Sequence, residues 1–195
     1  MNFRPLYYLD ISLLHIEDTS GLSRAEIIEN YNALIDYNSL FNRKPLSFPT
    51  LSMSETGRIH FEEVKVVFDL FGYMTLILLP VVAAGMIISK KTRSKAYLTV
   101  AGFLGILIPA LLGFLICRNW YAVFVRFHEL VFRNDYWIFD ESTDPVIMIL
   151  PDTFFMHCAV MIISLVIMSS IICIVAGLKK TGKKSSRRVR KRLPF

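Results

Sequence analysis

The chain has 195 residues, of which 54% are hydrophobic, and it carries a formal net charge of +6. This is too apolar for an ordinary soluble domain and too charged for a bare bundle of apolar helices. The three cysteines all lie within or at the edge of apolar stretches, so they give neither a disulfide framework nor a metal-ligand spacing. The composition predicts membrane-spanning segments attached to a polar domain.

Residues 1–65 predict a small cap that leads into the first membrane span. Ser23 and Glu26 have the spacing of a capping box, and the apolar residues behind them recur at helical intervals, which predicts a helix over 23–38. The apolar stretch 5–16 is compatible with either a strand or a helix, so a mixed α+β cap is expected. Because so small a cap buries little apolar surface alone, we expect it to lean on the membrane helices.

Three stretches without acidic or basic residues predict helices that cross the bilayer. They cover residues 70–88, 97–117 and 153–178. Each is long enough to cross ~30 Å of hydrocarbon at ~1.5 Å per residue. With its flanks, the first span is placed at 66–89.

Lysine and arginine residues orient these spans. The loop 90–96 holds four basic residues and the tail 179–195 holds nine, and neither contains an acid. Residues 1–65 and 118–152 together hold nine basic and fifteen acidic residues. The positive-inside rule therefore predicts a cytoplasmic loop and tail, with the cap and 118–152 outside the cell. Because the tail directly follows a membrane helix, we expect it to bind anionic lipid rather than nucleic acid.

This topology leaves the charged segment 1–65 to be translocated without an apolar signal sequence ahead of it. We therefore expect the physiological protein to have one further N-terminal span, which translation of the upstream DNA would reveal. The predicted fold class is a mostly α, polytopic membrane helix bundle with three spans present here, a fourth N-terminal span missing, and a small extracellular α+β cap.

Two segments join the cap to the bilayer, and each carries a histidine. His60 stands shortly before the first apolar run, and His128 lies in a predicted interfacial helix over 119–132. One face of that helix forms an aromatic stripe, made of Trp120, Phe124, Phe127, His128 and Val131. Partial desolvation lowers the pKa of an imidazole, so it leaves His128 neutral and able to act as a base near pH 7.

The sequence offers acid–base groups without the motifs of other chemistries. It contains no HExxH, no GxSxG, no Gly-rich phosphate loop and no water-side cysteine beside a histidine. A lone histidine near a membrane surface is more often a hydrogen-bonded structural residue than a catalytic one. Because two histidines lie on segments that reach the same boundary between cap and membrane, the structural and the catalytic interpretations are about equally favoured here. The competing hypotheses are a non-catalytic membrane assembly or partner-binding protein, and a membrane lipid hydrolase or intermolecular acyltransferase.

Two blocks of the chain resemble the signatures of the lipoprotein intramolecular transacylases, the Lit family of bacterial integral membrane proteins. The first block is His60-Phe61 followed by Val64-Lys65. The second block contains Phe127-His128, Phe132, Asn134-Asp135, Trp137, Asp144, Pro151 and Phe154-Phe155. The resemblance covers nearly the whole chain, with two departures: the family has four spans, and Glu63 stands where the family has aspartate.

The resemblance implies an enzyme of the bacterial cell membrane that uses no cofactor and no metal. Its substrate is a diacylglyceryl-modified lipoprotein, whose N-terminal cysteine takes the sn-2 acyl chain of its own glyceryl group onto its α-amine. The product is the N-acyl lyso-form. The two family histidines map onto His60 and His128, which are therefore the expected catalytic residues.

This reaction agrees with the residues present. Transfer from ester to amide is downhill, and donor and acceptor belong to one molecule, so neither a nucleotide nor an acyl-enzyme is needed. An α-amine has a pKa near ~8 and is partly protonated at neutral pH, so a base helps. We assign that role to His128, with His60 polarising the ester carbonyl or returning a proton; the two roles are interchangeable.

Two further groups of side chains are expected around the histidines. The orienting residues are Lys65, Asp69, Asn134, Asp135 and Asp144. A structural ion pair between the first two is the alternative interpretation. The aromatic walls of the substrate pocket are Trp120, Phe124, Phe127, Tyr136 and Trp137. These rings fit an interfacial aromatic belt equally well.

Overall fold

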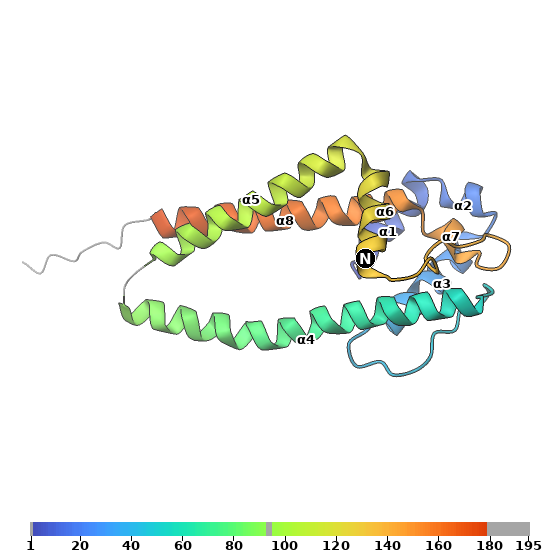
Figure 1. Cartoon of the computed structure of the whole chain (residues 1–195), viewed down its shortest axis with the longest axis horizontal. Helices are drawn as coiled ribbons and strands as arrows, with labels where there is room; N and C mark the ends of the chain where they lie inside the picture. The colour runs from blue at the N-terminus through green and yellow to red at the C-terminus, as the bar shows by residue number, and fades with distance from the viewer. Residues whose placement is uncertain (1, 93–94, 179–195) are drawn as a thin grey trace, which may run out of the picture.

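The computed structural model describes residues 2–92 and 95–178, and Figure 1 shows long helices on one side and a cluster of short ones on the other. Within these ranges the chain forms α-helices and loops but no β-strand, so the described chain is mostly α as predicted. The helices are α1 (Arg4–Leu13), α2 (Ile16–Ser20), α3 (Arg24–Tyr37), α4 (Glu55–Thr92), α5 (Ala96–Arg118), α6 (Trp120–Val131), α7 (Val146–Ile149) and α8 (Asp152–Leu178).

The cap consists of helices and loops in the part that the structure describes. The predicted α+β cap is therefore corrected to a helical one there. Pro5 lies in the first turn of α1, where a missing N–H leaves no hydrogen bond unmade. Tyr7 and Ile11, one helical turn apart, are both fully buried on one side of that helix. His15, with a φ of 52°, ends this run and begins α2. The apolar stretch therefore folds as two short helices because one side of it faces the cap core.

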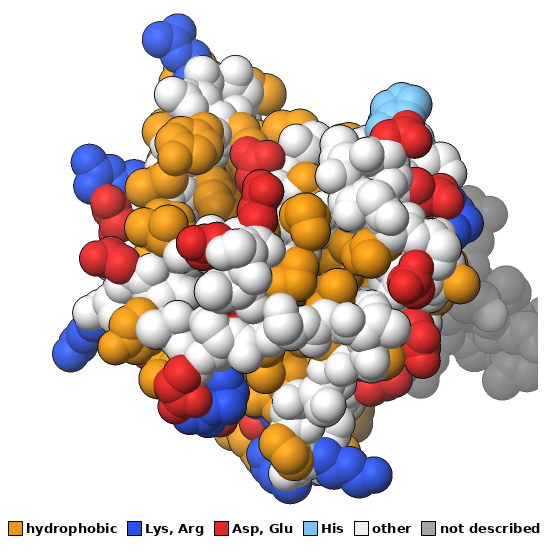
Figure 2. Space-filling view, turned by 90° about the vertical axis from the view of Figure 1, so that its right-hand side faces the viewer, with side chains coloured by type: hydrophobic (Ala, Val, Ile, Leu, Met, Phe, Trp, Pro, Cys, Tyr) orange, Lys and Arg blue, Asp and Glu red, His pale blue; other side chains and the backbone are white. Residues whose placement is uncertain are grey.

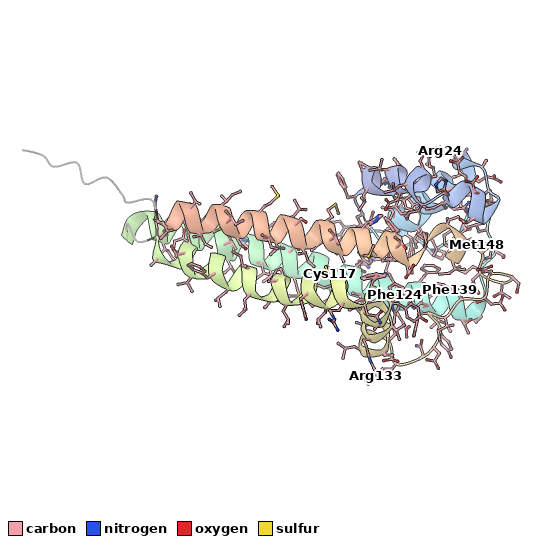
Figure 3. The ribbon with its side chains drawn as sticks, turned by 90° about the horizontal axis from the view of Figure 1, so that it is seen from above. Arg24, Cys117, Phe124, Arg133, Phe139 and Met148 are labelled. Carbon is pink, nitrogen blue, oxygen red and sulfur yellow. The ribbon has the colours of Figure 1, made fainter. Side chains whose placement is uncertain are left out.

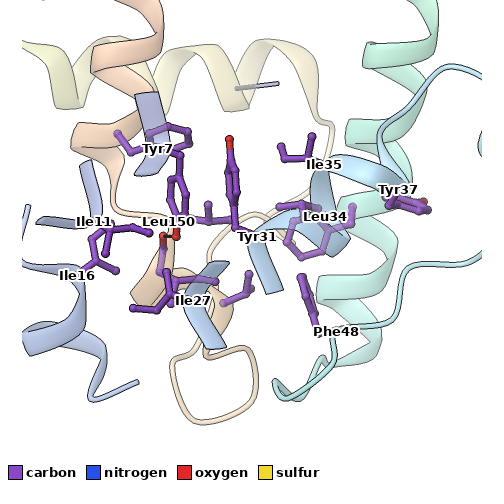
Figure 4. Packing of buried hydrophobic residues seen from close by; sticks show 14 of the residues in the cluster. Tyr7, Ile11, Ile16, Ile27, Tyr31, Leu34, Ile35, Tyr37, Phe48 and Leu150 are labelled. Atoms are coloured by element: carbon purple, nitrogen blue, oxygen red, sulfur yellow. Dashed lines mark hydrogen bonds between the residues drawn. The ribbon is translucent and has the colours of Figure 1, made fainter. Parts of the chain in front are cut away.

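α3 begins at the predicted capping box, which is confirmed. The Glu26 N–H donates to the Ser23 hydroxyl, and the Ser23 N–H donates to the Glu26 carboxylate at 2.9 Å. Behind this start, Tyr31 of α3 stacks on Tyr7 of α1 with ring centroids 3.6 Å apart (Figure 4). The pair of rings forms the centre of the cap core.

The cap core is completed by residues from the far end of the chain. Val146 and Ile149 of α7 and Phe154 of α8 are fully buried in it. The Tyr7 hydroxyl donates to the Ile149 carbonyl at 2.6 Å, and its ring meets the Phe154 ring edge-on at 5.0 Å. The cap therefore packs on the beginning of α8, which agrees with the expectation that it leans on a membrane helix.

Within 2–92 and 95–178, three helices are long and apolar enough to cross a membrane: α4, α5 and α8. α5 and α8 lie side by side in Figures 1 and 3. A Cβ at Gly102 of α5 would come within 2.6 Å of the Ser170 carbonyl oxygen of α8, so the missing side chain permits this approach. α4 runs apart from the pair in Figure 1, and its apolar side chains, such as Leu79, are exposed.

α4 has a polar part and an apolar part. Residues 55–69 include six charged residues, whereas 70–88 include none. We treat 70–88 as the membrane-spanning part, because uncompensated charges are costly in hydrocarbon. The first turns of α4 therefore belong to the cap. The predicted basic tail, 179–195, lies outside the described residues.

Candidate active site

The polar part of α4 carries His60 into the interior of the cap. The helix starts where Asp144, itself buried, accepts a hydrogen bond from the Ser54 N–H at 2.8 Å. Gly57 lies directly under this carboxylate, and a Cβ there would meet Asp144 Oδ1 at 2.2 Å. His60 follows one turn later and is only 5% exposed. A contact between distant parts of the sequence thus sets the start of the helix that bears the first histidine.

α6 carries His128 and lies across the ends of α5 and α8 (Figure 1). Asn119 caps its N-terminus by accepting a hydrogen bond from the Ala122 N–H at 3.0 Å. The Phe124 ring of α6 contacts Phe155 of α8, with centroids 5.7 Å apart. His128 follows one turn later and is half-buried, as the predicted stripe requires, whereas Phe127 of the same stripe is exposed.

The tautomer of neutral His128 follows from one hydrogen bond. Its Nδ1 lies 2.7 Å from the backbone oxygen of Phe124, and a carbonyl can only accept. Nδ1 therefore carries the proton and donates it. The lone pair of the ring is then on Nε2, which is the nitrogen available to take a proton.

The two histidines meet between α4 and α6, with ring centroids 6.1 Å apart. Phe132 packs against both, at 4.7 Å from His60 and 5.7 Å from His128. Phe139 covers His60 at 5.5 Å, and Trp137 covers His128 at 4.8 Å. Figure 3 shows Phe139 and Phe124 where the cap joins the long helices. Aromatic rings therefore surround the imidazole pair.

Burial controls the charge of both imidazoles. Desolvation, and to a smaller extent the nearby His128, lowers the pKa of His60 to about 4. Desolvation also lowers the pKa of His128, although its hydrogen bond to the Phe124 carbonyl acts in the opposite direction. Both rings are therefore neutral at pH 7. His60 Nδ1 is buried without a hydrogen-bond partner among the described residues.

Several of the predicted site residues lie beside the pair. Phe124 and Phe127 contact His128, with centroids at 4.2 and 5.4 Å, and Trp120 lies against Phe124 at 5.8 Å. Asn134 donates through Nδ2 to a Glu63 carboxylate oxygen at 2.8 Å. This bond ties the loop after α6 to the same part of α4 that carries His60.

Other predicted site residues lie away from the histidines. Lys65 donates to Asp69 at 2.8 Å and to the Ser39 carbonyl at 3.0 Å. Lys65 therefore joins α4 to the cap. This agrees with the alternative interpretation of Lys65 and Asp69 as a structural ion pair. Asp135 and Tyr136, which were expected beside the histidines, are exposed. The chain turns after Phe132, which brings the following tryptophan inward and leaves these two side chains outside.

Three residues of the site received no site role from the sequence, although Phe132 and Glu63 were named there in the family resemblance. Phe132 and Phe139 follow the end of α6, where neither helical nor strand periodicity indicates which side chain turns inward. Glu63 could have been found, because it follows His60 by about one helical turn and so shares its side of the helix. Across 2–92 and 95–178, no three His, Cys, Asp or Glu side chains come together as a metal site would require.

Comparison with known proteins assigns the family. A model of the family described as lipoprotein intramolecular transacylase Lit matches residues 1–155. The chain belongs to this family. A solved structure of Lit from Bacillus cereus is 38% identical with a TM-score of 0.87, covering 90% of this chain and 81% of that one.

Two further structures of Lit from the same organism carry a substitution of one histidine. The variant with arginine is 38% identical, with a TM-score of 0.78 and coverage of 88% of this chain and 77% of that one. The variant with alanine is 37% identical, with a TM-score of 0.76 and coverage of 88% and 78%. No curated protein matches the chain.

Proposed function

We propose that this chain is a lipoprotein intramolecular transacylase that moves the sn-2 acyl chain of a diacylglyceryl-cysteine to the α-amine of the same cysteine. Membership of the Lit family supports the reaction class, an acyl transfer. The observation that carries the catalytic assignment is the meeting of His60 and His128, far apart in sequence, within one aromatic enclosure. The product is a lyso-form lipoprotein with an N-acyl cysteine.

His128 is the base in this proposal. Its Nε2 carries the free lone pair, because Nδ1 donates to the Phe124 carbonyl. That hydrogen bond also favours the imidazolium that forms when the ring takes a proton from the substrate ammonium. The neutral amine can then attack the carbonyl carbon of the sn-2 ester. His60 is the poorer base of the two, since its pKa of about 4 lies far below that of an α-amine.

His60 serves the other half of the reaction. As a neutral imidazole protonated on Nε2, it can donate a hydrogen bond to the oxyanion that forms when the amine adds to the ester. When the bond to the glyceryl oxygen breaks, the attacking nitrogen loses a second proton and the leaving oxygen gains one, relayed by an imidazole. One amide and one alcohol form, and one proton from the original ammonium is released.

The aromatic enclosure supplies proximity. Amine and ester belong to one flexible molecule, so folding them together is the main entropic cost. Phe124, Phe132 and Trp137 give apolar surfaces against which the glyceryl group and acyl chains can pack. The buried Nε1 groups of Trp120 and Trp137 have no hydrogen-bond partner among the described residues.

The topology proposed with this function places the cap and α6 on the outer side of the cell membrane. Spans at 70–88, the uncharged part of the predicted 66–89, and at 97–117 and 153–178 then leave the loop 90–96 and the tail in the cytoplasm. The concentration of lysine and arginine in the loop 90–96 and the tail supports this orientation. Figure 2 shows acidic side chains spread over the end of the cap farthest from the spans. The histidines then lie where a lipoprotein anchored in the outer leaflet presents its ester.

The remaining polar residues hold the scaffold in this proposal. Asp144 positions the start of α4, and Lys65 with Asp69 fixes α4 to the cap. Asn134 fixes the loop after α6 through Glu63. Asp135, which is exposed, receives no role at the reacting atoms.

Mass spectrometry of lipoprotein N-termini tests the proposal directly. Cells that express the chain should accumulate N-acyl lyso-forms, and the His60→Gln and His128→Gln variants should each lose on the order of 10²–10⁴-fold in rate. A Glu62→Gln variant, which alters an exposed ion pair with Arg58, should stay active. Release of free fatty acid would indicate hydrolysis instead. Conversion by both histidine variants would remove the imidazoles from the mechanism.

A further inference from the structure

Glu63 presents an unused acceptor beside the histidine pair. Its Oε1 accepts from Asn134 at 2.8 Å, whereas its Oε2 is buried and has no hydrogen-bond partner among the described residues. Burying a carboxylate oxygen without a donor costs free energy, which a cationic ligand would recover. Glu63 lies about one helical turn from His60, on the same side of α4.

A cavity of about 320 Å³ adjoins this carboxylate. Its lining combines apolar and charged side chains: Glu63, Val66, Val67, Val131, Phe132 and Arg133. Phe132 is the wall shared with the active site, since its other contacts are the rings of His60 and His128. A molecule in this cavity therefore lies against the Phe132 ring, and the two imidazoles contact that ring.

The charges around the cavity favour one ligand class. Glu63 is the single anion in its lining, and the imidazoles of His60 and His128, which contact the lining residue Phe132, are neutral at pH 7. Arg133 is the only cation in the lining, and it is exposed, at the outer edge of the α6 region in Figure 3. The inner end of the cavity is thus suited to a small ammonium group with apolar chains beside it.

We propose that Glu63 binds the α-ammonium of the substrate cysteine and so selects lipoproteins with a free N-terminus. This inference rests on the proposed function. The ammonium donates to the Glu63 carboxylate while the acyl chains lie along the valines, which holds the nitrogen about one helical turn from His60. Acyl transfer converts the ammonium to a neutral amide, so the ion pair disappears in the product and release becomes easier.

The same ion pair has a kinetic consequence. A carboxylate favours the protonated form of a bound amine and raises its pKa, and only the unprotonated amine attacks the ester. Glu63 therefore aids binding but delays deprotonation. Its replacement by glutamine should raise KM about tenfold and shift the rising limb of the kcat–pH profile to lower pH. If the role of Glu63 were purely structural, its replacement would neither shift the rising limb of the kcat–pH profile nor raise KM relative to kcat in this way.

Two non-reactive lipopeptides give a binding test that does not depend on turnover. Both carry dialkyl ethers in place of the two esters; one has a free α-amine and the other an N-acetyl group. The full-length protein should bind the free amine about tenfold more tightly, and Glu63→Gln should abolish that preference while keeping an oxygen for Asn134. Glu63→Asp should retain part of it, and Glu62→Gln all of it.

The outcomes separate this proposal from the one on which it rests. If the unmodified protein fails to convert the diacyl lipopeptide, the proposed function fails. If it converts that lipopeptide but Glu63→Gln still prefers the free amine, the assignment of Glu63 is wrong and the reaction stands. Thermal unfolding of each variant confirms that the protein is folded; if Glu63→Gln does not fold, the Glu63→Asp variant decides the question by the same comparison.

Discussion

His60 and His128 have the same side chain but different surroundings. His60 is packed among Phe61, Phe132 and Phe139, and burial lowers its pKa to about 4. His128 is half-buried and keeps a hydrogen bond to a backbone carbonyl, which partly restores its basicity. One ring is therefore suited to remain neutral through the reaction, and the other to take a proton.

The pH dependence of activity follows from these environments. The histidines are neutral above pH 6.5 because both pKa values are lowered, so protonation of the substrate amine, with a pKa near ~8, governs the rate there. We expect kcat/KM on a diacylglyceryl lipopeptide to rise from pH 6 to 8 and then level off. A rate that falls over this range would show that an imidazolium is required instead.

His60 should also make stability depend on pH. Its folded pKa of about 4 lies below the unfolded value near 6.5, so the unfolded chain binds more protons between these values. Stability is thus present above pH 6.5 and is lost as the pH falls towards 4, by about 2 kcal/mol between pH 7 and pH 5. Thermal unfolding at the two pH values should show this loss in the unmodified protein and a smaller one in His60→Gln. Equal losses would contradict the pKa assigned to His60.

The helices differ in how far the sequence predicts them. The uncharged stretches predict the spans α5 and α8 because length and apolarity alone decide whether a helix can cross a bilayer. The aromatic stripe likewise predicts α6. Periodicity does not decide the fate of residues 5–16, since a short apolar run suits a strand as well as a helix. It also cannot reveal that Asp144 begins α4, because that contact joins distant parts of the chain.

The start of α4 is a testable element of the site. Asp144→Ala removes the carboxylate that accepts a hydrogen bond from the Ser54 N–H. That N–H is then left without this partner. We expect a loss of about 1–3 kcal/mol in the free energy of unfolding. We also expect reduced activity, because His60 is on the following turn. Asp144→Asn keeps an amide oxygen for this hydrogen bond and should lose less. If Ala and Asn variants behave alike in denaturant titrations, the hydrogen bond is not what fixes the helix.

The contact between α5 and α8 gives a second test with a matched control. A Cβ at Gly102 would lie 2.6 Å from the Ser170 carbonyl oxygen, which belongs to backbone and cannot rotate away. Gly102→Ala should therefore force the helices apart and lower the thermal stability of the purified protein. Gly113→Ala, on the same helix with no atom within 4 Å of the added Cβ, should leave it unchanged or raise it slightly. Equal effects would mean that the close approach does not stabilise the pair.

At the scale of the whole molecule, the core of the cap is formed by segments that lie far apart in the sequence. α1 and α3 provide Tyr7 and Tyr31, and the start of α8 provides Phe154, which contacts both rings at 5.0 and 6.0 Å. The sequence predicts that a small cap needs outside support, since its size limits what it can bury. It cannot identify the supporting residues, because nothing local distinguishes Phe154 from the other apolar residues of its span.

This closure predicts that the segment 1–53 does not fold by itself. Without Val146, Ile149 and Phe154, the core around Tyr7 and Ile27 would face water, and α3, at 14 residues, is only marginally stable as an isolated helix. Far-UV circular dichroism of a peptide covering 1–53 should therefore show little helix and no cooperative thermal transition. In the full-length protein, Phe154→Ala should weaken the same cap, which limited proteolysis in the loop between α3 and α4 would detect. A cooperative transition in the peptide would mean that the cap is an independent domain and that α8 is only attached to it.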